Sequence, residues 1–169
     1  MKRFSRIQAV AGAIAVLAVM VAPSAAQQNG VMNGASADRK EIHDYVLTTD
    51  KLTRFERAAT GVQTVLKDTP GLQDQLNADA QNNAGPNTIA QSVAALDKYP
   101  QLVSIIKSNG FSTHEYIVIT FVIMNVYTYI AVKKTSPNLP MPPAVSPANV
   151  TFIQSNFARV DALVQLMSQ

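Results

Sequence analysis

Hydrophobic residues recur with helical spacing in two long segments of this chain. Between residues 50 and 67, apolar side chains return every three or four positions and charged side chains occupy the opposite side. This pattern predicts an amphipathic helix with Thr49 as its N-cap. A matching seam follows Pro147, with Ser146 as a suitable cap, so a last helix is predicted to start there. The seam positions are Leu52, Phe55, Ala59, Val62 and Leu66 in the first segment and Val150, Ile153, Phe157, Val160, Val164 and Met167 in the last.

Shorter helical pieces are predicted between these two segments. The Pro-Gly pair at 70–71 ends the first helix, and residues 72–76 support only one or two further helical turns. Asn87 is the predicted cap of the next helix. Pro100 suits the first position of another short helix, which the Asn-Gly pair at 109–110 ends in a left-handed turn. The predicted buried positions of these two helices are Ile89, Val93, Leu96, Leu102, Ile105 and Ile106.

The most apolar segment is the run 116–132, which carries the clearest start signal in the chain. Ser112 and Glu115 have the spacing of a capping box, and Phe111 and Tyr116 have the spacing of a hydrophobic staple around the same cap. Many residues of the run favour strands on propensity alone. We nevertheless predict a helix, because the cap is strong and no second strand is available for pairing. A helix that is apolar on all sides is predicted to be buried on all sides.

The same run has an alternative interpretation as a membrane span. Residues 116–132 reach the lower length limit for a transmembrane helix, and Lys133-Lys134 would then act as a stop-transfer signal. Against this, Thr120, Asn125 and Thr128 lie inside the run, and its tyrosines are spread along it. We therefore favour a buried core helix, with no membrane span in the mature chain.

Five prolines, at 137, 140, 142, 143 and 147, predict an extended, stiff crossover over residues 136–147. The spacing of Pro137, Pro140 and Pro143 also matches ligands of adaptor domains with aromatic grooves, although a strap across the protein explains it more simply. Together these features predict an all-α, single-domain bundle of about five helices, with a buried central helix over 113–134.

The N-terminus has the pattern of a secretory signal peptide. A basic start is followed by the apolar run 9–22 and by small residues at 23–26, which predicts a leader of residues 1–26 cleaved between Ala26 and Gln27. The protein is then exported, to the periplasm or the medium of what we infer is a bacterium. A polar, glycine-containing stretch predicts a disordered tail over 27–38, and the helical domain is predicted to cover 39–169.

Removal of that leader changes the charge balance and the classes of partner that it allows. The chain has 14 Lys and Arg against 11 Asp and Glu, and three of the basic residues, Lys2, Arg3 and Arg6, belong to the leader, so the mature balance is zero. Without a clustered basic face we predict no nucleic-acid binding. Cysteine is absent, so disulfides and thiol chemistry are excluded.

Two histidines are the main candidates for chemistry. His43 lies between Glu41 and Asp44, which could form a loose surface metal contact, but a charged linker explains the cluster better. His114 precedes Glu115 at the start of the apolar helix, where an acid-base pair meets the positive helix end. A solvated His114 and a capping Glu115 explain this pair without any function. No nucleophile elbow or phosphate loop is present, so we predict no catalytic residues, metal site or cofactor.

The sequence leaves three classes of function. An exported interaction or structural module, which binds an unknown protein or a second copy of itself, is favoured. The first alternative is a carrier that holds a small apolar ligand between helices, with tyrosines and threonines of the central helix as polar contacts. The second is a weak hydrolase or lyase that uses His114 and Glu115. The triplet Asn149-Val150-Thr151 resembles a glycosylation acceptor, but its place at a predicted helix start makes coincidence the better explanation.

Overall fold

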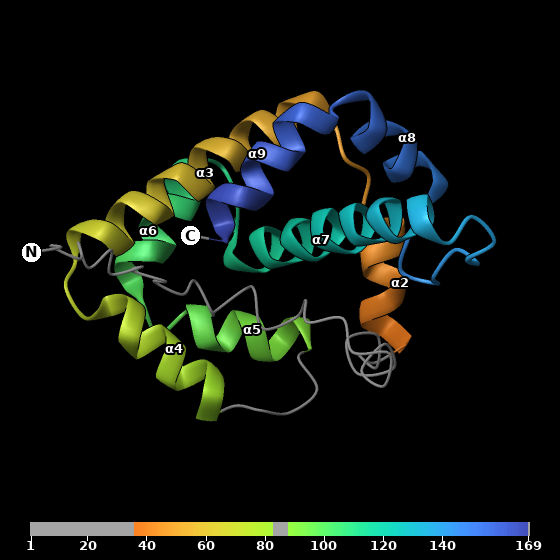
Figure 1. Ribbon diagram of the computed structural model, residues 1–169. Coiled ribbons are helices and arrows are strands. Elements are labelled where there is room, and N and C mark those ends of the chain that lie inside the picture. Colours follow the sequence, from red (N-terminus) through yellow and green to blue (C-terminus); the bar gives the residue numbers. More distant parts are fainter. Residues whose placement is uncertain (1–35, 83–87, 169) are drawn as a thin grey trace, which may run out of the picture.

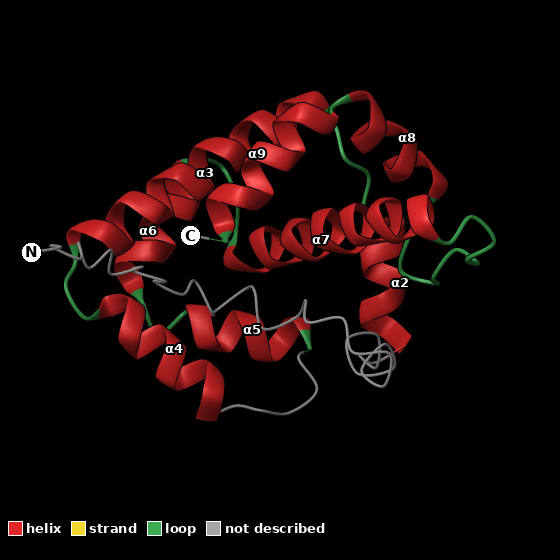
Figure 2. Ribbon diagram, in the orientation of Figure 1, coloured by secondary structure: helices red, strands yellow, loops and turns green. Residues whose placement is uncertain are grey.

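The computed structural model describes residues 36–82 and 88–168, and every regular element within them is a helix (Figures 1 and 2). This confirms the all-α class, but the predicted count of about five helices is too low, because these residues contain eight. The predicted leader, its Ala26/Gln27 cleavage site and residues 27–35 of the predicted tail lie outside the described residues. The helices are α2 Ser36–Asp44, α3 Thr49–Asp68, α4 Leu72–Asn82, α5 Ile89–Leu96, α6 Pro100–Ser108, α7 Thr113–Thr135, α8 Pro147–Ser155 and α9 Phe157–Met167.

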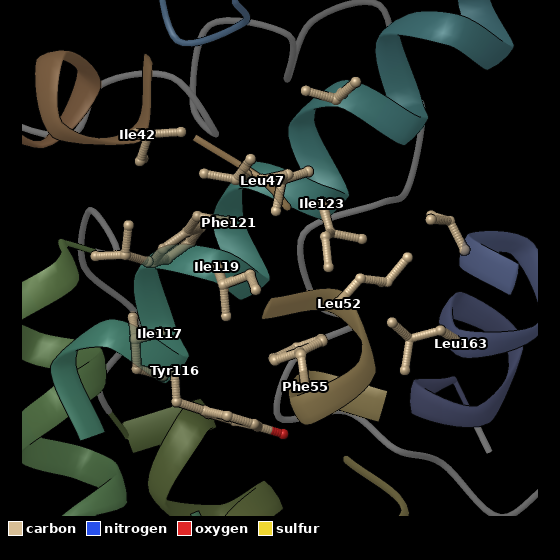
Figure 3. Packing of buried hydrophobic residues seen from close by; sticks show 14 of the residues in the cluster. Ile42, Leu47, Leu52, Phe55, Tyr116, Ile117, Ile119, Phe121, Ile123 and Leu163 are labelled. Carbon is tan, nitrogen blue, oxygen red and sulfur yellow. The ribbon is translucent and has the colours of Figure 1, made fainter. Parts of the chain in front are cut away.

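Helix α7 lies inside the fold, as its composition predicts, and covers the predicted range 113–134. Helices α2, α5, α6, α8 and α9 all pack against it. In Figure 1, α3 and α9 run together along one side of α7 and α5 lies along the other. Figure 3 shows Ile119 and Ile123 of α7 directed toward Leu52 and Phe55 of α3, and all four side chains are buried. The core therefore forms around the apolar helix.

The start of α7 is built by the local signals that the sequence carries. The Ser112 hydroxyl accepts a hydrogen bond from the Glu115 amide at 3.0 Å. Phe111 and Tyr116 both pack on the ring of Phe55 from α3, with ring centroids at 6.3 and 5.0 Å. The staple residues thus fasten the helix start to a second helix through Phe55, and each such aromatic contact stabilises by ~0.5 to 1.5 kcal/mol beyond the burial of its area.

The stop before α7 is also the predicted one. Gly110 has a φ of +80°, the left-handed conformation that favours glycine. Its amide donates to the carbonyl of Lys107 at 2.9 Å, and the Phe111 amide donates to the carbonyl of Ile106 at 3.3 Å. These two bonds form a Schellman motif, so only four residues, 109–112, separate α6 from α7.

Two predicted caps are displaced by one residue. The N-cap of α3 is Thr48, not Thr49, and its side chain accepts from the Lys51 amide. The N-cap of α5 is Thr88, which forms a complete capping box with Gln91; the predicted cap Asn87 lies outside the described residues. At both helix starts the N-cap is the threonine whose side chain accepts a hydrogen bond from the backbone amide three residues further along the chain.

The predicted last helix is divided in two, which the sequence pattern missed. Asn156 has φ −116° and ψ 23° and separates α8 from α9. Its side-chain amide donates to the carbonyl of Phe152 at 2.9 Å, a local bond that competes with helix continuation. The break allows α8 to pack on α7 while α9 packs beside α3 (Figure 1).

Two shorter segments also differ from expectation. Helix α2 starts at Ser36, so residues 36–38 are helical where the pattern predicts a tail. Ile42 of α2 is buried in the core, and the carboxylate of Asp38 accepts from the Ile89 amide at 3.0 Å, which caps α5 from a distant part of the chain. Helix α4 has 11 residues instead of one or two turns. Leu72 and Leu76 pack in a second apolar cluster with Tyr99 and Leu102, and in the added turns Asp79 accepts hydrogen bonds from Lys98 and from the Tyr99 hydroxyl at 3.1 and 3.0 Å.

Helices α3 and α6 approach each other closely at Gly61. A Cβ atom at this position would lie 2.6 Å from Cγ2 of Ile105, a separation that real contacts essentially never show. The absence of a side chain therefore sets the distance between the two helices.

Candidate functional site

His114 and Glu115, the predicted acid-base pair, lie in the first turn of α7 and both contact the segment before α3. The His114 Nε2 atom lies 2.6 Å from Oε1 of Glu41 on α2. Both side chains are about half exposed, at 52% and 45%. The pair therefore joins α2 to α7 at the surface, and such exposed pairs stabilise by ~0 to 1 kcal/mol.

Glu115 does not complete the predicted capping box by reaching back to its cap. Its carboxylate instead accepts a hydrogen bond from the Tyr45 hydroxyl at 3.0 Å. The pKa of Tyr45 is raised well above its ordinary value of 10.0. Burial of the phenol is the main cause, and the hydrogen bond to the Glu115 carboxylate is the second. Tyr45 also has the Lys51 ammonium 4.0 Å from its ring centroid. The acid of the predicted pair is thus engaged in a structural contact.

His43, the other candidate, stays on the surface of α2 beside Asp44. Its Nδ1 atom lies 3.0 Å from a carboxylate oxygen of Asp44, whose second oxygen pairs with Lys40. These two contacts lower the pKa of Asp44, and the hydrogen bond from Lys40 has the larger effect. Among residues 36–82 and 88–168, no three His, Cys, Asp or Glu side chains are grouped so that they could hold a metal ion.

Asn149 has a structural role that the sequence analysis did not recognise. It is 1% exposed, its Oδ1 atom accepts from the Leu47 amide at 3.0 Å and its Nδ2 atom donates to the Tyr45 carbonyl at 2.7 Å. The loop 45–48 between α2 and α3 is therefore fastened to the first turn of α8. Nδ2 is the atom that glycosylation would modify, so its burial supports the interpretation of the triplet at 149–151 as coincidence.

The proline-rich crossover reaches the same first turn of α8 from the other side. It has turns at 137–138 and 143–144 and an irregular stretch between them, so it is less uniform than the extended strap that was predicted. Lys133 donates to the Leu139 carbonyl at 2.8 Å, and the Val145 amide donates to the Pro142 carbonyl at 2.9 Å. Ala144 and Val145 are buried.

We call these two loops, residues 45–48 and 136–146, together with the first turn of α8, the α8 junction. The loop residues Val46 and Met141 are 57% and 41% exposed. Among the described residues, they are the only large apolar side chains that are exposed. Their backbones are held by the bonds of Asn149, Lys133 and Val145, and Lys51 adds a bond to the Val46 carbonyl at 3.0 Å. The junction therefore combines a fastened backbone with free apolar side chains.

Two hydroxyl groups of α7 that a carrier could use to contact its ligand are engaged within the protein. Thr120 donates to the Tyr116 carbonyl at 2.7 Å, and Tyr127 donates to Asp161 of α9 at 2.5 Å. The Tyr127 ring stacks on Phe157 at 5.8 Å. In the described part of the chain, no buried side-chain nitrogen or oxygen lacks a hydrogen-bond partner. These contacts give no support to the carrier hypothesis.

Comparison with known proteins supplies no further assignment. We found no protein-family model that matches the chain, and no curated protein or solved structure with significant similarity to it. The functional argument therefore rests on the geometry of the chain itself.

The structure brings His114 and Glu115 together with two residues that the sequence analysis did not connect to them, Glu41 and Tyr45. It does not bring His43 into this group. Glu41 lies 73 positions from His114 in sequence, and Tyr45 lies 70 positions from Glu115. No local pattern signals such distant pairs.

Proposed function

We propose that this protein is an exported, non-catalytic binding module that contacts a protein partner through the α8 junction. The observation that carries the proposal is the exposure of Val46 and Met141 on loops whose backbones are fastened. The proposed leader of residues 1–26 would place the module in the periplasm or the medium.

The physical argument is one of preorganisation. A flexible loop must lose conformational entropy when it binds, whereas a fastened loop has already lost it on folding. Prolines at 137, 140, 142 and 143 restrict the backbone of the crossover further. Binding through Val46 and Met141 then removes apolar surface from water at little entropic cost, and a methionine side chain adapts to irregular partner surfaces.

The contacts of His114 and Glu115 support the non-catalytic part of the proposal. Each side chain is engaged with a neighbouring segment, through Glu41 and Tyr45. The Ser112 hydroxyl beside them is engaged with the Glu115 amide as the cap of α7. The cluster thus has a sufficient structural role as a clasp between α2 and α7, and we assign it that role.

Site-specific photocrosslinking in the native host tests the proposal. A photoreactive amino acid replaces Met141 in one variant and Gln101 in the control, where Gln101 is an exposed residue of α6 away from the junction. We expect a discrete adduct from position 141 and none from position 101. An adduct of twice the chain mass would identify the partner as a second copy of the chain.

A second variant keeps the result interpretable. Val46→Asp places a charge at an exposed position, so the fold should be retained and the adduct from position 141 should decrease strongly. Equal adduct yields from positions 101 and 141, or a Val46→Asp protein that crosslinks like the parent, would contradict the proposal.

A further inference from the structure

We propose that α7 is also a bilayer-spanning segment, which leaves the shell of shorter helices when the protein meets an anionic membrane. This inference is independent of the α8 junction, because it rests on the length, composition and internal bonding of α7. Among the described residues, α7 is the one helix long and apolar enough to cross a membrane. In the fold described above, 61% of its apolar window is buried, so insertion requires α7 to leave these contacts.

The dimensions of α7 approach those of a bilayer. Its 23 residues span about 34 Å, and its uncharged part, residues 116–132, spans about 26 Å, against about 30 Å for the hydrocarbon core. Lys133 and Lys134 stand at its C-terminal end, where they would reach lipid phosphate groups. Between Tyr116 and Val132 the helix has no charged side chain.

Two polar side chains inside this apolar stretch are bonded to the helix's own backbone. Thr120 donates to the carbonyl of Tyr116 at 2.7 Å, and the Asn125 amide donates to the carbonyl of Phe121 at 2.8 Å. Such bonds remain when the helix moves as a unit, so they lower the cost of placing these groups in lipid. Thr120 and Asn125 are two of the three residues, with Thr128, whose polarity speaks against a membrane span, and their bonding weakens that objection.

None of the other described helices is both long and apolar enough to span a bilayer. Five helices that pack on α7, namely α2, α5, α6, α8 and α9, have between 8 and 11 residues. Helix α3, whose Phe55 also packs on α7, has 20 residues but carries charged side chains along one side. A spanning helix needs about 20. Their contacts with α7 are mainly apolar, and lipid tails replace apolar contacts at little cost.

Irregular segments connect α7 to its neighbours at both ends, residues 109–112 before it and 136–146 after it, so insertion requires the turn at Gly110 and the bond between Lys133 and the Leu139 carbonyl to open. Gly110, with φ +80°, precedes it, and the proline-rich crossover from Ser136 follows it. The side-chain links to the surrounding elements are concentrated in the first turn, at Tyr127 and at Lys133. Release therefore requires few polar contacts to break.

Depth-dependent fluorescence quenching tests the insertion directly. The chain has no cysteine, so Met124→Cys in the middle of α7 and Arg57→Cys on the exposed side of α3 each give one labelling site for an environment-sensitive dye. Each labelled protein is mixed with vesicles of equal parts phosphatidylglycerol and phosphatidylcholine that carry quenchers either at the bilayer centre or near the headgroups.

We expect the dye at position 124 to shift its emission to shorter wavelength and to be quenched more by the central quencher. The dye at position 57 should show neither change. Unchanged emission at position 124, or the same quenching profile at both positions, would overturn the proposal, the second because it indicates general unfolding onto the membrane surface.

A matched pair of threonine variants distinguishes insertion from adsorption. Thr128→Lys puts a charge into the span at a partly exposed position of α7, and Thr64→Lys makes the same change on the exposed side of α3. A lysine inside the hydrocarbon should reduce the inserted fraction by at least about tenfold, whereas Thr64→Lys should leave it unchanged. Equal insertion of both lysine variants would contradict the proposal. Crosslinking at position 141 would be unaffected by that outcome, so the two proposals fail separately.

Discussion

The start of α7 and the α8 junction show two opposite uses of apolar side chains in one small protein. At the start of α7, Phe55 packs between Phe111 and Tyr116, and all three rings are buried. At the α8 junction the backbone is fastened by hydrogen bonds, while Val46 and Met141 point their apolar surface outward. Apolar packing of these rings holds the first region together, whereas the second combines hydrogen bonds of Asn149 and Lys133 with the buried side chains of Leu47, Ala144 and Val145. This difference teaches that a surface loop can be ordered on its inner side while it leaves single apolar side chains exposed.

The largest effect is expected where side chains carry the structure. Phe55→Ala removes the ring on which Phe111 and Tyr116 pack and leaves a cavity, so the free energy of unfolding should fall by ~3 to 5 kcal/mol. Urea denaturation followed by circular dichroism measures it. Met141→Ala, the matched change at the junction, should alter the same quantity by less than about 0.5 kcal/mol. Similar losses for both variants would erase the proposed contrast between the regions.

A smaller loss is expected from removal of the polar fastening. Asn149→Ala leaves the Leu47 amide and the Tyr45 carbonyl without their side-chain partner, which should cost ~1 to 3 kcal/mol of unfolding free energy. Asn138→Ala, an exposed asparagine of the crossover, is the control and should change stability little. If Asn149→Ala is as stable as the control in the same urea titration, the loop 45–48 is not held in the way described.

Asn149 and Asn156 illustrate how far the sequence alone could lead. The signals that it revealed are local: Ser112 and Ser146 as caps, Gly110 as a left-handed stop and the apolar run of α7. Asn149 bonds to a loop 102 positions away, so its role depends on a fold that no spacing rule predicts. The break at Asn156 was missed for another reason, because the apolar seam continues through it.

The candidate site was predicted in the same partial way. His114 and Glu115 are indeed neighbours at the start of α7, but their partner Glu41 comes from residues that were interpreted as a charged linker, and Tyr45 follows that linker directly. Helix α2 was not recognised because nine residues with a single buried side chain, Ile42, carry too little periodicity. Its order depends on packing against α7.

Alkaline pH should weaken the clasp through Tyr45. Its pKa is raised in the folded protein, so folding holds the phenol proton and stability is complete below the ordinary pKa of 10.0. Above that pH the unfolded chain loses the proton first, and stability should fall by at most about 1.4 kcal/mol per pH unit. Tyr45→Phe removes this contribution, so urea midpoints between pH 9 and 11.5 should decline less steeply in the variant. Parallel declines in both proteins would show that Tyr45 is not responsible.

The smallest effect is expected at the exposed pair of the clasp. His114→Ala removes the contact with Glu41 and should lower the free energy of unfolding by less than about 1 kcal/mol, because both side chains are near half exposed. A double-mutant cycle with Glu41→Ala isolates the pair energy. A coupling above about 2 kcal/mol would show that this surface contact supports the fold to the same extent as the buried rings.

Hydrogen exchange of the Leu47 amide tests the central claim most directly, because this amide lies in a surface loop and bonds only to the side chain of Asn149 in our account. We predict that it exchanges as slowly as amides in the interior of α3 and that Asn149→Ala abolishes this protection. Exchange of the Leu47 amide at the rate of an unstructured peptide in the parent protein would contradict the claim that the α8 junction is a fastened platform for exposed apolar side chains.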